Sequence, residues 1–164
     1  MTIPLELKLI SMPEGPRLSW TPVKELQSLR IRSWSFVPAI LKPESANLLA
    51  DVKAELVELR AEFEPGDASE VAFNVRGATI VFDAKKQELA VNDHRAPAPL
   101  RGGKQELWIY CDRTALEVFA SGGLIYVPMP FTPKADDFAL GVHTKDGSAR
   151  ITALEVHELK SAWR

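Results

Sequence analysis

The sequence predicts an all-β chain folded as a two-sheet antiparallel β-sandwich with little helix. Apolar and polar residues alternate with a period of two in several short runs, as expected of strands with one buried face. Turn-forming residues separate these runs at intervals of about 8–12 residues, which is typical of sandwiches and barrels. Together, the alternation and the turn spacing define the fold class.

The predicted strands follow from the alternation. It is clearest between Val57 and Phe63, where odd-numbered apolar residues are expected to face the core. Similar runs cover residues 71–75, 116–120 and 151–158, and turn signals lie at 64–67, 92–93, 101–103, 121–123 and 145–147. Acidic residues on the opposite strand faces are expected to be solvated: Glu58, Glu62, Glu70 and Glu88.

Two segments carry helical signals. Residues 22–29 predict about two turns, with Thr21 as N-cap and Pro22 at the first position. Residues 46–56 are compatible with a helix, because their apolar residues fit a 3.6-residue period, or with a strand beginning near Lys53. We therefore expect one module over residues 1–164, with a connecting arm at 1–29 and the sandwich at 30–164.

The composition excludes several classes of partner. Lys and Arg number 20 against 22 Asp and Glu, so the net charge of −2 argues against nucleic-acid binding. No run approaches the ~18 apolar residues of a membrane span, and the first ten residues do not resemble a signal peptide. No membrane partner is expected, and the localisation stays unassigned. The single cysteine, Cys111, precludes an intrachain disulfide and predicts a buried, inert thiol.

The sequence predicts no catalytic, cofactor or metal site. The glycines form neither a phosphate loop nor a dinucleotide fingerprint, and no nucleophile elbow is present. Asp136 and Asp137 lack further ligands at cation-binding spacing, so a self-solvating loop is expected. The histidines are scattered singly at positions 94, 143 and 157.

Aromatic residues are the candidates for recognition. They are Trp20, Trp34, Trp108, Tyr110, Tyr126 and Trp163. Trp108 and Tyr110 share a strand face with Glu106 and Asp112, and such a mixed face suits stacking against sugar rings. The other interpretation is that they cover the second sheet or an interdomain surface. Trp34, Trp108 and Tyr110 are therefore candidate sugar or interdomain contacts.

Residues 107–123 resemble a hallmark of family 32 glycoside hydrolases, which include invertases, levanases, inulinases and sucrose-6-phosphate hydrolases. The matching positions are Asp112, Arg113, Glu117, Val118, Phe119 and Gly122. Residues 2–9, 22–30 and 154–163 are also similar to family segments, so the resemblance spans nearly the whole chain. It implies the family's C-terminal sandwich, of jelly-roll or concanavalin-like type. The family's catalytic motifs, which lie in a five-bladed propeller, do not occur here.

A structural interpretation of the hallmark follows from its alternation. Leu107, Ile109 and Cys111 form one apolar face, the chain turns near residues 113–115, and the next strand returns. Arg113 is expected to lock this hairpin by charge-assisted hydrogen bonds to Asp112 or Glu117. We therefore assign Asp112, Arg113, Glu117, Phe119 and Gly122 a structural role.

Three hypotheses for function follow. The first is a non-catalytic C-terminal module of a β-fructofuranosidase- or levanase-like enzyme, which braces a catalytic propeller that this chain lacks. The second is a lectin-like module that binds fructan or another glycan through an aromatic face. The third is an enzyme with an unrecognised site. Self-association through a surface left by the absent propeller is a further expectation.

Overall fold

The computed structural model describes residues 2–162, so the predicted match at Trp163 lies outside the described residues. Strand accounts for 58% of the structure and helix for 6%, which confirms the all-β prediction. The strands are β1 (Leu5–Met12), β2 (Gly15–Pro22), β3 (Arg30–Phe36), β4 (Ala39–Leu41), β5 (Val57–Glu64), β6 (Glu70–Val75), β7 (Ala78–Asp83), β8 (Glu88–Val91), β9 (His94–Pro97), β10 (Gln105–Cys111), β11 (Ala115–Ala120), β12 (Ile125–Pro130), β13 (Leu140–Lys145) and β14 (Ala149–Leu159).

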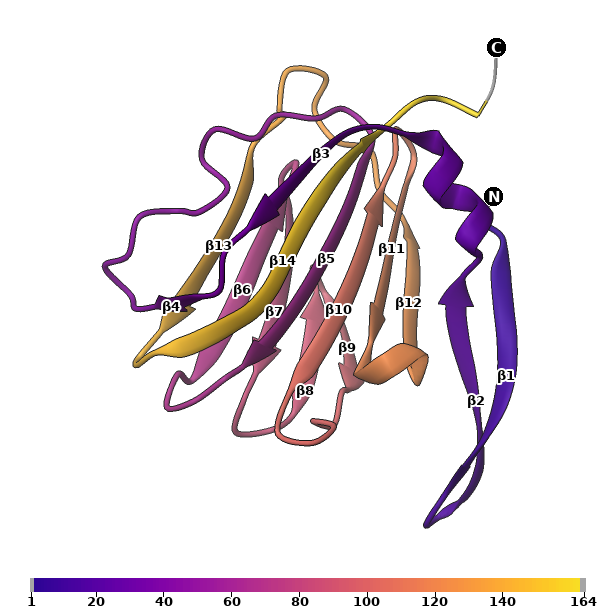
Figure 1. Ribbon diagram of the computed structural model, residues 1–164, viewed down its shortest axis with the longest axis vertical. Coiled ribbons are helices and arrows are strands. Elements are labelled where there is room, and N and C mark those ends of the chain that lie inside the picture. The colour runs from indigo at the N-terminus through magenta and orange to yellow at the C-terminus, as the bar shows by residue number, and fades with distance from the viewer. Residues whose placement is uncertain (1, 163–164) are drawn as a thin grey trace.

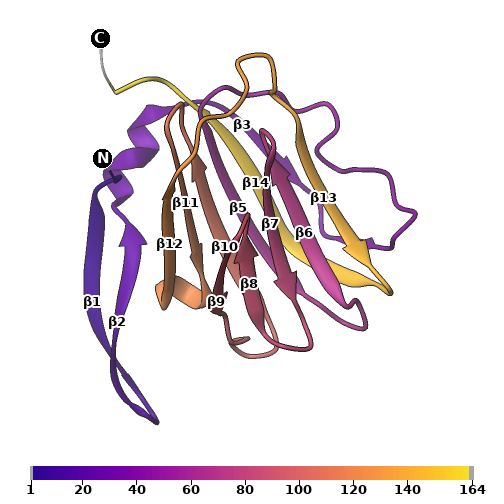
Figure 2. The same cartoon turned by 180° about the vertical axis from the view of Figure 1, so that it is seen from behind.

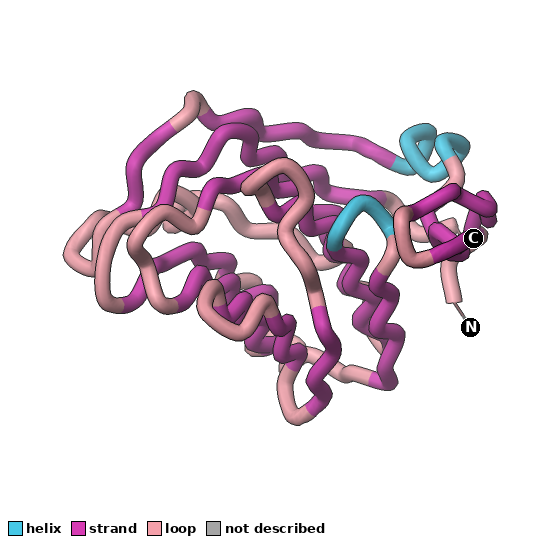
Figure 3. Tube along the Cα trace, turned by 90° about the horizontal axis from the view of Figure 1, so that it is seen from below, coloured by secondary structure: helices cyan, strands magenta, loops and turns pink. Residues whose placement is uncertain are grey.

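Within residues 2–162, two antiparallel sheets pack face to face (Figures 1 and 2). The seven-stranded sheet has the order β12-β11-β10-β5-β14-β3, and β4 also pairs with β14. The five-stranded sheet has the order β13-β6-β7-β8-β9. The predicted two-sheet antiparallel sandwich is therefore confirmed, and Figure 3 shows its two layers from below.

The core lies between the sheets and follows the predicted alternation. On β5, the four apolar residues from Val57 to Phe63 are buried, with exposed fractions of 2% or less. Phe63 contacts Phe73 of β6 and Phe82 of β7, with ring centroids 6.0 and 5.8 Å apart. Aromatic contacts thus join the centre of the large sheet to the centre of the small one.

The helical predictions need correction. Residues 24–29 form a 3-10 helix, η1 (Lys24–Leu29), whose N-cap is Val23, so the predicted Thr21 cap and Pro22 start are wrong. Residues 46–56 form neither a helix nor a strand; they are turns, with Lys53 in an isolated bridge to Ala139. The Asn47 side chain explains this, because it donates to the Leu140 carbonyl and accepts from the Val142 N–H. These bonds attach the loop to β13. The apolar residues Leu49 and Val52 of the loop are buried although no helix forms.

The β1–β2 hairpin stands beside the sandwich and extends beyond its end (Figures 1 and 2). It forms its own two-stranded sheet, whose contacts with the sandwich are made by β2 on β12 and on a short 3-10 turn, η2 (Ser121–Gly123). The chain then passes through η1 into β3. We keep the division into an arm at 1–29 and a sandwich at 30–164 as a proposal.

Candidate interdomain and carbohydrate-contact surface

The outer face of the seven-stranded sheet carries a row of polar side chains that face away from the core. Strand register places Glu117, Tyr110, Glu58, His157 and Ser33 opposite one another across β11, β10, β5, β14 and β3. The first four are buried, with exposed fractions of 5% or less. Burying polar groups is costly unless they form hydrogen bonds, so each member of this row is expected to have a partner.

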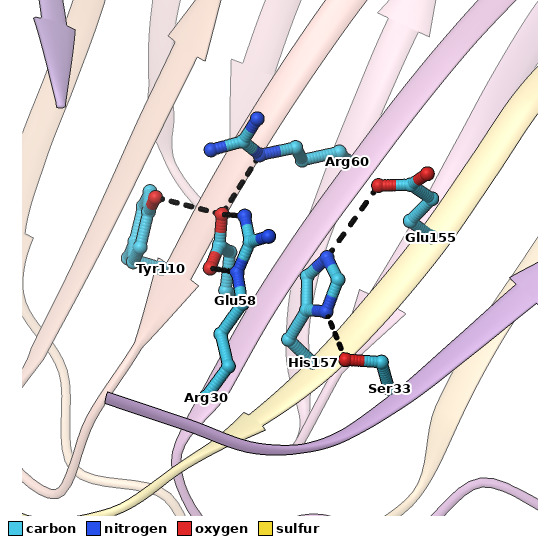
Figure 4. Close-up of polar contacts among 7 residues, drawn as sticks. All are labelled: Arg30, Ser33, Glu58, Arg60, Tyr110, Glu155 and His157. Carbon is cyan, nitrogen blue, oxygen red and sulfur yellow. Dashed lines mark hydrogen bonds and ion pairs between the residues drawn. The ribbon is translucent and has the colours of Figure 1, made fainter. Parts of the chain in front are cut away.

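Glu58 is the centre of the row, and its burial corrects the prediction that it is solvated. It is 0% exposed and accepts two hydrogen bonds from the Arg30 guanidinium, at 2.8 and 2.6 Å. Arg60 Nε and the Tyr110 hydroxyl donate to the same carboxylate at 2.7 and 2.9 Å (Figure 4). Burial opposes ionisation, but the Arg30 hydrogen bonds and the two arginine charges outweigh it, so the pKa of Glu58 is lowered.

A β-bulge in β3 accompanies this network. Glu158 of β14 lies opposite Arg32, whereas Leu159 lies opposite Arg30, so Ile31 is an extra residue in β3. A bulge changes the side toward which the neighbouring side chains point. Arg30 and Ser33 consequently reach the same outer face, where Arg30 meets Glu58 and Ser33 meets His157.

His157 continues the row toward the edge of the sheet. Its Nδ1 lies 2.7 Å from the Ser33 hydroxyl oxygen, and its Nε2 lies 3.5 Å from a Glu155 carboxylate oxygen (Figure 4). Burial lowers the pKa of His157, and the positive charge of Arg30 lowers it further. His157 is therefore expected to be neutral at pH 7, whereas the neighbouring Glu58 is ionised.

The other acidic residues predicted on solvated faces are partly exposed and paired. Glu62 contacts Lys104 at 2.8 Å, Glu70 contacts Lys145 at 3.0 Å and Glu88 contacts Arg95 at 2.8 Å. Exposed ion pairs of this kind contribute little to stability. Glu58 therefore differs from them in burial as well as in partners.

The hallmark residues Asp112 and Arg113 lie in the β10–β11 turn. Asp112 Oδ1 accepts hydrogen bonds from the Thr114 and Ala115 N–H groups, at 2.6 and 2.7 Å, which fixes the turn. Arg113 does not bond to Asp112 or Glu117 as predicted. Its Nε donates instead to Glu55 at 2.7 Å, because the loop before β5 brings that carboxylate alongside.

Glu117 fastens the N-terminal arm to the sandwich. It is 3% exposed, and its carboxylate accepts from the Ile3 N–H at 2.8 Å and from the Tyr126 hydroxyl. Burial raises the pKa of Glu117, although the hydrogen bonds from Tyr126 and Ile3 act in the opposite direction. Both carboxylate oxygens are thus engaged in holding structure.

Phe119 lies within a column of aromatic rings that connects the hairpin to the large sheet. It stacks on Tyr126 with centroids 4.7 Å apart, and Tyr126 stacks on Trp20 of β2 at 5.9 Å. On its other side Phe119 meets the edge of Tyr110 at 6.3 Å. The column buries Phe119, which is 2% exposed, and seats the hairpin on β12.

The glycines of η2 allow β2 to approach closely. The Ser19 hydroxyl donates to the Gly122 carbonyl at 3.1 Å, and Gly122 has a positive φ of 68°. A Cβ on Gly123, whose φ is +83°, would lie 2.5 Å from the Trp20 carbonyl oxygen. A side chain at this position would therefore clash with the backbone of the hairpin.

Gly123→Ala is expected to loosen the arm, with a cost of about 2–3 kcal/mol from clash and backbone strain. Limited trypsin digestion should then cleave at Arg17 and Lys24 faster than in the parent chain. Gly102→Ala is the matched control, because Gly102 has a φ of +58° and nothing within 4 Å of its added Cβ. Equal acceleration in both variants would contradict a specific contact with β2.

The predicted aromatic contacts do not share one surface. Trp108 and Tyr110 lie on the outer face, where the Arg60 guanidinium carbon is 4.5 Å from the centroid of the Trp108 ring. Trp34 instead packs against the core from the edge strand β3. Sequence reasoning missed the Arg30–Glu58–Arg60 cluster, since a glutamate on an alternating strand carries no signal of its burial.

One face of the hairpin is apolar, and its leucines are exposed to solvent. Register pairs Leu7 with Trp20 and Leu9 with Leu18, and directly paired residues share a face. Leu7, Leu9 and Leu18 are 52%, 74% and 40% exposed. These three leucines and Trp20 are called the hairpin face below. Contiguous exposed apolar side chains of this kind mark interaction surfaces.

The structure also describes the single cysteine and the loop that contains Asp136 and Asp137. Cys111 is 2% exposed, and burial raises the pKa of its thiol to about 12. Asp137 Oδ1 accepts from the Ala139 N–H at 3.0 Å within its own loop. Among residues 2–162, no three His, Cys, Asp or Glu side chains gather as a metal site requires. No helix in the described part of the chain could span a membrane.

Comparison with known proteins shows that the chain is similar to part of two levanases. It is 31% identical over 185 residues to a levanase of Bacillus subtilis (strain 168), an alignment covering 99% of this chain and 27% of that protein. A levanase of Bacillus sp. (strain L7) is 26% identical, with 100% and 20% covered. The chain thus spans about a quarter or less of the length of these relatives.

The fold matches solved structures of similar proteins. An exo-inulinase from Aspergillus awamori superposes with a TM-score of 0.83 at 18% identity, covering 99% of this chain and 36% of that one. A fructan 1-exohydrolase IIa from Cichorium intybus gives 0.72 at 16% identity, covering 95% and 40%. A family model described as "Glycosyl hydrolases family 32 C terminal" matches residues 25–158. The chain therefore belongs to the family of C-terminal domains of family 32 glycosyl hydrolases.

Proposed function

We propose that this chain is a non-catalytic β-sandwich module that braces the catalytic propeller of a fructan-hydrolysing enzyme. In family 32 enzymes this domain accompanies such a catalytic domain. The observation that carries the proposal is the hairpin face, whose three leucines are exposed and whose Trp20 is held on Tyr126 of β12. A fructan-cleaving parent is inferred from the relatives, two of which are named levanases.

Several contacts hold the arm firmly against the sandwich. Glu117 holds the Ile3 N–H, the aromatic column holds Trp20, and Gly123 lets β2 approach without an intervening side chain. Among the described residues β1 pairs only with β2, so its other edge offers unpaired backbone groups to a further strand. A neighbouring domain can therefore bind through apolar contact and strand pairing at once.

Three acidic residues of the hallmark hairpin and the outer face, Glu58, Asp112 and Glu117, support a non-catalytic role through their contacts. Glycosidases use two carboxyl groups, one of which must be free to donate a proton. Glu58 is bonded to two arginines and Tyr110, and both oxygens of Glu117 accept hydrogen bonds. Asp112 holds the turn that follows β10. Each of these carboxylates is committed to a structural contact.

A chimeric enzyme tests this proposal. We expect a truncated Bacillus subtilis levanase without its own sandwich to be unstable, and the chimera carrying this chain to recover thermal stability. Leu9→Asp should abolish the recovery, because it places a charge on the hairpin face. Val37→Asp is the control, since Val37 is 82% exposed outside that face. A chimera no more stable than the truncated enzyme would refute bracing.

The chain alone is expected to release no sugar from levan, inulin or sucrose. Reducing-sugar assays on the purified chain provide the measurement, with the chimera as the positive reference. Turnover above background that persists in Asp112→Asn and disappears in another carboxylate variant would identify a catalytic site. That outcome would reject the non-catalytic assignment.

A further inference from the structure

A small cavity of about 140 Å³ lies where the hairpin meets the outer face of the large sheet. It is lined by Thr21, Glu106, Trp108, Phe119, Gly122 and Gly123. Its walls therefore come from β2, β10, β11 and η2, which are all fixed by the contacts described above. The cavity adjoins the Glu58 cluster through Arg60, which contacts Trp108, but neither Glu58 nor the leucines of the hairpin face line it.

The cavity joins an aromatic ring to an unused carboxylate. Trp108 is half-buried, and Arg60 stacks on its ring at 4.5 Å. Glu106 lies two residues earlier on the same strand face and is also half-buried. Within residues 2–162 the Glu106 carboxylate has no hydrogen-bond or ion-pair partner, whereas neighbouring Glu62 and Glu58 are both paired. A half-buried acceptor without a partner is available to a ligand.

The lining is mainly apolar, and its two polar side chains, Glu106 and Thr21, favour a neutral ligand that carries hydroxyl groups. An anion would be repelled by Glu106, and the cavity lacks the group of ligands that a metal ion requires. An aromatic wall stacks on the C–H face of a sugar ring, and a carboxylate accepts hydrogen bonds from adjacent hydroxyls. The Thr21 hydroxyl adds a donor and acceptor at the same opening.

We propose that this cavity binds a single fructosyl unit of a fructan chain, outside the site that cleaves it. Trp108 stacks on the ring, and Glu106 accepts hydrogen bonds from its hydroxyl groups. The choice of fructose rests on the proposed function, whereas the preference for a neutral sugar rests on the cavity itself. Such a site would hold polymeric substrate close to the catalytic domain that the module braces.

Titration of the 164-residue chain with fructan oligosaccharides tests this site. We expect a millimolar Kd for levan- and inulin-derived oligosaccharides, followed by NMR of the backbone amide signals of the residues that line the cavity. The saturable shift should be absent in Trp108→Phe and present in Trp34→Phe, whose ring packs on the core. Glu106→Gln should weaken binding about tenfold, as expected for loss of a charged hydrogen bond.

The controls separate the outcomes. Glu158→Gln, which changes a carboxylate on β14, should leave the affinity unchanged. Absence of any shift at saturating oligosaccharide, or a shift that persists in Trp108→Phe, would overturn the site. Equal binding of dextran oligosaccharides would overturn its assignment to fructans. The chimera experiment needs no sugar titration of this chain, so bracing and sugar binding can fail independently.

Discussion

Glu58→Ala is expected to lower the free energy of unfolding by about 3 kcal/mol or more, the largest effect among outer-face carboxylates. Removing one partner of a buried ion pair costs roughly 3–5 kcal/mol, because the remaining charge loses its compensation. Arg30 and Arg60 are 19% and 26% exposed and can partly rehydrate, which favours the lower end of that range. Chemical denaturation followed by circular dichroism provides the measurement.

A matched control is Glu158→Ala, which removes a partner of Arg32, whose side chain is 68% exposed. Glu158 itself is 20% exposed, and its carboxylate oxygen lies 3.5 Å from Arg32 Nε, so we expect a change of about 1 kcal/mol or less for this partly exposed pair. Similar losses in the two variants would contradict the special role of burial at Glu58.

The stability of the parent chain should also depend on pH through Glu58. Its pKa is lower in the folded chain than the ordinary value of 4.5, so the unfolded chain binds more protons in acid. The stabilising contribution is therefore complete above the unfolded pKa and is lost as pH falls through the lowered folded pKa. Glu58→Ala should flatten this acidic part of the stability profile relative to the parent chain.

Phe119→Ala is expected to cost about 3–5 kcal/mol, as for other fully buried aromatic residues truncated to alanine. The loss should reach the arm, because Phe119 supports Tyr126, and Tyr126 supports Trp20. We expect Trp20 emission to shift to longer wavelength at denaturant concentrations below the main unfolding transition. Fluorescence and circular dichroism together separate release of the hairpin from unfolding of the sandwich.

Phe119→Leu tests the contribution of ring stacking. Leucine keeps most of the apolar volume, so the change in volume should lower the free energy of unfolding by less than about 1.5 kcal/mol. Loss of the ring contacts should add about 0.5–1.5 kcal/mol. If leucine and alanine at this position were equally destabilising, the apolar volume of Phe119 would not explain the alanine effect.

Much of the sandwich could be predicted from the period-two alternation. The apolar residues of β5, β6 and β11 face the core as expected, and the predicted turns lie at strand ends. In β14 the alternation is interrupted by a register shift against β5, which leaves Ala153 exposed. The 107–120 hairpin was also predicted with its inward-facing residues. These features depend on local pattern, because a residue's side of a strand is fixed by its position along that strand.

The polar contacts of the outer face were less accessible to sequence reasoning. Arg113 donates a hydrogen bond to Glu55, which lies 58 residues earlier in the sequence, and no local pattern identifies that partner. Glu58 resembles any solvent-facing glutamate until the bulge at Ile31 brings Arg30 beside it. The helical period at 46–56 was overridden by hydrogen bonds from Asn47 to β13. Each failure involves contacts between residues distant in sequence.

The position of β14 has a consequence for how the chain folds during synthesis. This strand follows every other described strand in the chain, yet it lies between β5 and β3 in the large sheet. Until residues 149–159 leave the ribosome, β3 and β4 have no neighbour and the hydrogen-bonding edge of β5 stays open. The nascent chain must therefore avoid aggregation while this gap persists, and the large sheet is completed only after translation of the strand that joins β5 to β3 and β4.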